Sequence, residues 1–133
     1  MNKLSLVRIL SAAFGASDAV TGLALILFPS LVLRLLSIDP ASNDSEIYLR
    51  WIGVFVLGVG LSYACCFSRS MLRGETVWIV TSIVRGLVSL FLILQVLSGQ
   101  MPSAWLAVAL FDGMLAALQI LLVRRGWWKE AGA

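Results

Sequence analysis

Three charged residues lie deep inside long apolar stretches of the sequence and a fourth lies near the end of one, and they are the residues whose types and spacing suggest chemistry. They are two carboxylic acids and two guanidinium groups, namely Asp18, Arg50, Arg85 and Asp112. An unpaired charge in hydrocarbon costs about 2.5–3.5 kcal/mol on insertion scales. We therefore expect these side chains to face one another as a formally neutral buried cluster. Such a cluster can join helices, form the polar end of a ligand pocket, or move protons or ions.

The composition explains why buried charges stand out in this chain. Of its 133 residues, 60% are hydrophobic and only 13% are charged, and the mean hydropathy is +0.97. A soluble domain carries about 25% charged residues, so the sequence predicts an integral membrane protein. Although the net charge is +3, the basic residues flank the apolar stretches. That pattern is typical of membrane topology signals and does not indicate nucleic-acid binding.

Several catalytic classes are excluded by the residues that the sequence lacks. It contains no histidine, which removes imidazole ligands for haem or zinc and the Ser-His and Cys-His nucleophile pairs. The two cysteines are adjacent, Cys65 and Cys66, and neighbouring cysteines seldom bridge. No glycine-rich phosphate loop is present. We therefore expect a non-enzymatic protein with no catalytic residues, no metal site and no cofactor.

Four apolar stretches have the length that a membrane-spanning helix requires, about 20 residues. They cover residues 7–27, 47–67, 76–97 and 104–123. These stretches must be helical, because hydrocarbon offers no partner for unpaired backbone groups. Short links make consecutive helices antiparallel neighbours. The sequence thus predicts an all-α fold in which residues 1–133 form a single transmembrane domain, a four-helix up-down bundle.

The connection between the first two spans carries a further apolar segment. Residues 31–36 contain one charge, Arg34, and are too few to cross a membrane. This pattern predicts a short interfacial helix between spans 1 and 2.

The basic residues are distributed unequally between the two sides of the predicted bundle. Seven fall on the side of the termini and two, Arg34 and Arg50, on the other; the seven are Lys3, Arg8, Arg69, Arg73, Arg124, Arg125 and Lys129. Cytoplasmic loops carry the excess of Lys and Arg. We therefore expect both termini in the cytoplasm.

Positions along the spans predict that the buried charges meet near the middle of the membrane. With a rise of 1.5 Å per residue, Asp18 lies about 16 Å, Arg85 about 13 Å and Asp112 about 18 Å from the cytoplasmic side. Arg50 begins about 6 Å inside the opposite boundary, within reach of the other three.

Small and polar residues share one face on each span, which predicts an inward polar stripe with apolar side chains turned to lipid. The four stripes are Ser11, Gly15, Asp18 and Gly22; Arg50, Gly53 and Gly60; Ser82, Arg85 and Ser89; and Ala109, Asp112, Ala116 and Gln119. We interpret Gly53, Gly58 and Gly60 as sites of close helix approach. Gln95 and Gln119, near span ends, are interpreted as polar side chains that snorkel to the interface.

Three short motifs resemble those of the small bacterial DoxX-like membrane proteins. The segment that begins Arg50-Trp-Ile-Gly53 and ends Gly60-Leu-Ser-Tyr63 is similar to their R-x-x-G…G-L pattern. Arg85-Gly86 and Phe111-Asp112-Gly113 are similar as well. The resemblance implies a four-helix bundle in a bacterial cytoplasmic (inner) membrane, and some relatives are described as membrane subunits of quinone-linked oxidoreductases. It carries over no cofactor ligands.

The sequence leaves more than one function open. The leading hypothesis is an accessory or scaffold subunit, or a binder of a lipophilic small molecule, whose partners are the bilayer and either another membrane protein or a second copy. The alternative is a small proton- or ion-coupled transporter or channel acting as a homo-oligomer, with Asp18 or Asp112 titrating against the two arginines. A membrane enzyme is least favoured, because carboxylates paired with arginines suit general-base chemistry poorly.

Overall fold

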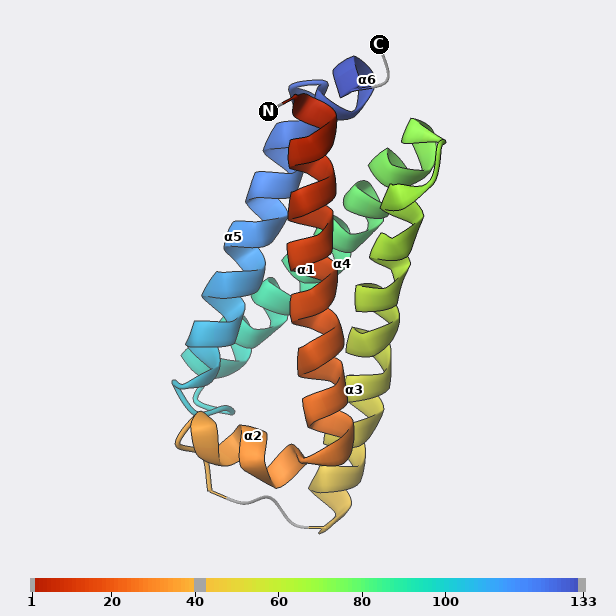
Figure 1. The fold of residues 1–133 in the computed structure, drawn as a ribbon. Coiled ribbons are helices and arrows are strands. Elements are labelled where there is room, and N and C mark those ends of the chain that lie inside the picture. The colour runs from red at the N-terminus through yellow and green to blue at the C-terminus, as the bar shows by residue number, and fades with distance from the viewer. Residues whose placement is uncertain (1, 40–42, 132–133) are drawn as a thin grey trace. The chain divides into compact units, whose positions relative to one another are not determined.

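The computed structural model describes residues 2–39 and 43–131, and these contain helices and no strand. The elements are α1 (Lys3–Leu27), α2 (Pro29–Leu35), α3 (Asn43–Ser62), the 3-10 helix η1 (Tyr63–Phe67), α4 (Met71–Leu97), α5 (Trp105–Arg124) and α6 (Trp127–Ala131). Figure 1 shows their order along the chain. The prediction of an all-helical protein is confirmed for the part of the chain that the structure describes.

Within the described residues, four segments are long and apolar enough to cross a membrane: Lys3–Leu27, Asp44–Phe67, Leu72–Leu97 and Trp105–Arg124. They correspond to the four predicted spans. The first three begin about one helical turn earlier than hydropathy predicts. Hydropathy marks only the part of a helix that suits hydrocarbon, whereas the backbone hydrogen bonds continue through flanking polar residues.

The distribution of side chains is the reverse of that in a soluble protein, because large apolar side chains are exposed and several polar ones are buried. Large Leu, Ile, Val and Phe side chains are widely exposed; Leu87, for example, is 62% exposed. The buried polar side chains are Ser11, Asp18, Thr81, Ser82, Arg85, Ser89 and Gln119. A soluble protein rarely exposes large contiguous apolar patches. Together with the four apolar helices, this sorting indicates a multi-pass membrane protein.

The chain divides into two compact units. The N-terminal unit, Arg8–Phe67, contains most of α1 together with α2, α3 and η1. The C-terminal unit contains α4, α5 and α6, within Ser68–Ala133, and includes the described residues of Met1–Val7.

Glycines bring α1 and α3 into close contact within the N-terminal unit. A Cβ atom at Gly22 would lie 2.5 Å from the Leu57 nitrogen and 2.8 Å from the Gly53 carbonyl oxygen. A Cβ at Gly60 would lie 2.8 Å from the carbonyl oxygen of Gly15. The glycines are seven residues apart on each helix, which is close to two turns and keeps both on one face. Their reversed pairing is that of antiparallel helices, and it explains why backbone meets backbone here.

Gly58 does not take part in this contact. A Cβ placed on it would meet nothing within 4 Å. The prediction of close approach therefore holds for Gly53 and Gly60 and is wrong for Gly58, which lies on another face of α3 because it is neither three, four nor seven residues from both.

A short helix occupies the connection between the first two spans, as predicted, although it begins earlier, at Pro29. Proline suits this first helical position, because its fixed φ is helical and no N–H is needed there. The helix ends where Ser37 adopts φ 56° and Ile38 N–H donates to the Leu33 carbonyl at 2.9 Å. Figure 1 shows α2 running across the end of the unit where α1 finishes and α3 begins.

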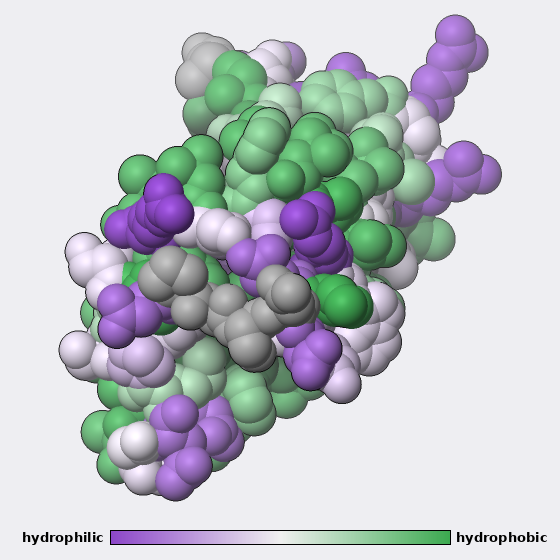
Figure 2. Space-filling view, turned by 90° about the horizontal axis from the view of Figure 1, so that it is seen from below, coloured by the Kyte–Doolittle hydropathy of each residue, from purple (hydrophilic) through white to green (hydrophobic). Residues whose placement is uncertain are grey.

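Viewed from below, hydrophilic residues are interspersed with hydrophobic ones (Figure 2). The Ser30 hydroxyl donates to the Glu46 carboxylate, which ties α2 to the first turn of α3. That α2 lies in a membrane interface stays a prediction.

The helices α4 and α5 form an antiparallel hairpin in the C-terminal unit (Figure 1). Gly99, at φ +74°, closes α4, and the Gln100 N–H donates to the Gln95 carbonyl at 2.9 Å. Glycine is favoured at this left-handed position because it has no Cβ.

The short helix α6, which the sequence did not reveal, contacts both α4 and α5. Its Trp128 is buried: a Cβ at Gly74 of α4 would lie only 2.3 Å from the Trp128 ring. The same ring meets Trp78 edge to face, with centroids 5.5 Å apart. The indole of Trp128 thus occupies the space that a side chain at position 74 would need.

Candidate functional site

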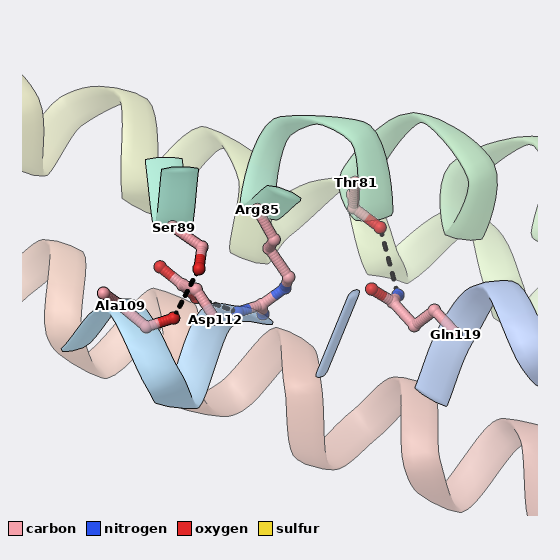
Figure 3. A network of polar contacts seen from close by, with 6 residues as sticks. All are labelled: Thr81, Arg85, Ser89, Ala109, Asp112 and Gln119. Carbon is pink, nitrogen blue, oxygen red and sulfur yellow. Dashed lines mark hydrogen bonds and ion pairs between the residues drawn. The ribbon is translucent and has the colours of Figure 1, made fainter. Parts of the chain in front are cut away.

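The most polar contact inside a predicted span joins Arg85 of α4 to Asp112 of α5. The Arg85 Nη1 donates to the Asp112 Oδ1 at 2.6 Å (Figure 3). Only 4% of the arginine side chain is exposed, against 18% of the aspartate side chain. A hydrogen bond between a guanidinium and a carboxylate is stronger than one between neutral groups, and the scarcity of water around the pair strengthens it further.

Two neutral hydrogen bonds flank the ion pair on the same helix faces (Figure 3). The Ser89 hydroxyl donates to the Ala109 carbonyl at 2.7 Å. On the other side, the Gln119 amide donates to the Thr81 hydroxyl at 3.1 Å. We call the six residues of these three contacts the α4–α5 polar ladder: Thr81, Arg85, Ser89, Ala109, Asp112 and Gln119.

The ladder follows from sequence spacing. Steps of three, four and seven residues keep side chains on one helix face. Positions 81, 85 and 89 of α4 are four residues apart, and positions 109, 112 and 119 of α5 are three and seven residues apart. The partners pair in reverse order, as antiparallel helices require. Gly113 sits beside the ladder, where a Cβ would lie 2.8 Å from the Ser89 oxygen. The small residue therefore lets α4 come close enough for the hydroxyl to reach the Ala109 carbonyl.

The interpretation of Gln119 as a snorkelling side chain is wrong. Gln119 is fully buried, with 0% exposure, and is bonded across to α4. Its position three residues after Ala116 and seven after Asp112 had already placed it on the inward face. That periodicity was the better signal, because distance from the helix end alone does not say which way a side chain points.

The other two predicted residues belong to the N-terminal unit. Asp18 of α1 is buried, at 8% exposure, between the two glycines that contact α3. Arg50 of α3 is exposed, and its guanidinium donates to the Ile26 carbonyl. Ile26 is eight residues beyond Asp18, about 12 Å along α1, so Arg50 holds the end of α1 in this unit. The convergence of all four charges in one cluster stays a prediction.

A shallow groove lies beside the polar ladder on the same hairpin. It has a volume of about 280 Å³ and is lined by Ile79, Ser82 and Ile83 of α4 and by Ile120, Val123 and Arg124 of α5. The lining is apolar except for Ser82 and the arginine at one end. The Ser82 hydroxyl donates to the Ile79 carbonyl at 2.7 Å, so its proton is already used.

Among the described residues, no group of three or more His, Cys, Asp or Glu side chains is placed to hold a metal ion. Cys65 is exposed and Cys66 is buried, and the two do not form a disulfide. The polar ladder and the groove are therefore the two features of the hairpin from which a function can be argued.

Comparison with known proteins adds no relative to this description. No protein-family model, no curated protein and no solved structure matches the chain.

Proposed function

We propose that this chain is a non-catalytic accessory subunit of a bacterial cytoplasmic membrane that binds a lipophilic molecule at its α4–α5 hairpin. The observation that carries the proposal is how the hairpin uses its polar groups. The polar ladder consumes them between the two helices, while the groove beside it is walled by isoleucine and valine. A surface of this kind suits an apolar ligand better than a polar substrate.

In this proposal the Arg85–Asp112 pair is structural. Two opposite charges facing each other across neighbouring helices specify which faces meet, and they satisfy each other where lipid offers no hydrogen bonds. The resemblance to DoxX-like proteins implies the same architecture, a four-helix bundle, and the unequal distribution of Lys and Arg favours cytoplasmic termini.

The test is native mass spectrometry of the protein extracted gently from its own membranes. We expect a retained lipophile, or a membrane-protein partner carrying one, that a harsh detergent wash removes. A bare protein with neither lipophile nor partner after gentle extraction would overturn the proposal.

One observation favours a second function, a proton- or ion-coupled transporter that works as a homo-oligomer. The Asp112 side chain keeps 18% exposure although Arg85 is almost completely buried, so one partner of the pair remains accessible. In proteoliposomes, transport would show flux that Asp112→Asn and Asp18→Asn abolish and that the exposed control Asp39→Asn leaves intact. Flux identical in all variants, or no flux, would exclude this function.

A further inference from the structure

The groove on the α4–α5 hairpin combines an apolar wall with one cation at its end. Its residues recur at positions i, i+3 and i+4 on each helix, 79, 82 and 83 on α4 and 120, 123 and 124 on α5. One turn of each helix thus contributes to the wall. Arg124 is the last residue of α5, so the cation marks the end of the groove nearest the helix terminus.

The guanidinium of Arg124 is available to a ligand. It is exposed, and it makes no hydrogen bond or ion pair with the side chains and backbone that the structure describes. Two more basic residues follow it closely, Arg125 and Lys129, both exposed. Glu75, near the start of α4, is an acidic residue at the same end, but the basic residues outnumber it, so the field there stays positive.

The charge, rather than the apolar wall, must decide what binds here in a membrane. Lipid tails are as apolar as isoleucine, so moving a tail from bulk lipid into the groove gains little by the hydrophobic effect. Binding a phosphate to a guanidinium is more favourable, because the planar N–H groups of the guanidinium match the phosphate oxygens. Near a membrane surface one basic residue attracts anionic lipid by about 1 kcal/mol.

We infer that the groove binds one anionic phospholipid, with an acyl chain along Ile79, Ile83 and Ile120 and the headgroup phosphate on Arg124. This inference rests on the proposed function and names the class of its lipophile. A free phosphate ion would use Arg124 alone, whereas a phospholipid also uses the apolar wall that continues from it. The occupant is thus distinguished by its dependence on both parts.

The test measures lipid retention by native mass spectrometry after the full-length protein is equilibrated with equal amounts of phosphatidylglycerol and phosphatidylcholine. We expect wild-type protein to retain one phosphatidylglycerol in preference to phosphatidylcholine. Arg124→Gln should lower that preference about tenfold, by loss of a charge-assisted contact. Arg124→Lys should keep part of it. Arg125→Gln is the matched control, since it removes the adjacent charge but no groove residue, and should change the preference less than Arg124→Gln does.

A second pair of variants tests the apolar wall without touching charge. Ile83→Trp fills the groove, whereas Val84→Trp adds the same ring at an exposed neighbouring position that does not line it. Only Ile83→Trp should reduce phosphatidylglycerol retention. Inorganic phosphate added in excess should not displace the lipid.

Three results would overturn the inference: equal retention of the two lipids, equal effects of Arg124→Gln and Arg125→Gln, or equal effects of the two tryptophan variants. The proposed function is judged separately, by the lipophile recovered from native membranes. A neutral lipophile whose retention is indifferent to Arg124→Gln would refute the anionic-lipid site and leave the proposed function standing. Recovery of no lipophile would refute both.

Discussion

At the scale of single residues, the ion pair between Arg85 and Asp112 makes each side chain depend on the other. Replacing one partner leaves a charge among apolar groups, whereas replacing both removes the cost together with the attraction. We expect Arg85→Met to lower the free energy of unfolding by about 3 kcal/mol, and the double variant Arg85→Met/Asp112→Ala to lower it less. Reversible unfolding by SDS in mixed micelles measures both.

The matched control for this pair is Leu110→Ala, an exposed position on α5 two residues before Asp112. This substitution should change the free energy of unfolding little, because the Leu110 side chain is exposed and is not packed in the core. The single variant Asp112→Ala completes the comparison. If the double variant loses as much stability as Arg85→Met and Asp112→Ala lose together, the coupling between the two residues is contradicted.

Ser37 is the second residue whose role can be tested alone. It is the only non-glycine residue among those described with a positive φ, 56°, and it closes α2. A left-handed backbone conformation costs an L-residue about 1 kcal/mol, and glycine avoids this cost. Part of the gain is lost, because glycine also increases the conformational entropy of the unfolded chain. We expect Ser37→Gly to raise the free energy of unfolding by about 0.5 kcal/mol. The control Ser98→Gly, at a helix end with φ −81°, should lower it or leave it unchanged.

At the scale of elements, the close pairing of α1 with α3 depends on glycines, whose lack of a Cβ atom lets the two backbones meet. We expect Gly22→Ala to cost about 1–3 kcal/mol, because its methyl group would meet the Leu57 backbone at 2.5 Å. The same change at Gly58, where nothing lies within 4 Å, should cost nothing measurable. SDS unfolding of the two variants makes the comparison, and equal losses would show that glycine content alone, rather than close approach, matters in α3.

The elements also show how far the sequence reaches. The four long helices were predictable, because a run of about 20 apolar residues has no alternative in hydrocarbon. The polar faces of α4 and α5 were predictable from spacing, but the sequence predicted a cluster of four charges and did not specify that Arg85 would pair with Asp112. The helix α6 was not predictable, since five residues show no periodicity. The difference between Gly58 and Gly60 was also present in the spacing, because the inward stripe of α3 contains Gly53 and Gly60 and leaves Gly58 on another face.

At the scale of the whole molecule, the orientation in the membrane is the property most open to a direct test. The excess of Lys and Arg around the termini and residues 68–75 predicts that these lie in the cytoplasm. In a Cys65→Ser/Cys66→Ser background, we expect Ser37→Cys and Ser98→Cys to react with a membrane-impermeant maleimide in intact cells. Ser70→Cys should react only after permeabilisation. The reverse pattern would invert the topology, and labelling of all three from outside would indicate two orientations.

The edge-to-face contact of Trp78 with Trp128 has an optical consequence. Two indoles 5.5 Å apart with their planes at 85° are close enough for their electronic transitions to couple, and their fixed geometry gives that coupling a sign. The near-ultraviolet circular dichroism of the protein therefore carries a signal from the attachment of α6 to α4. Its loss in Trp128→Phe identifies it, and from then on the signal reports, without any label, when the C-terminal helix leaves the hairpin.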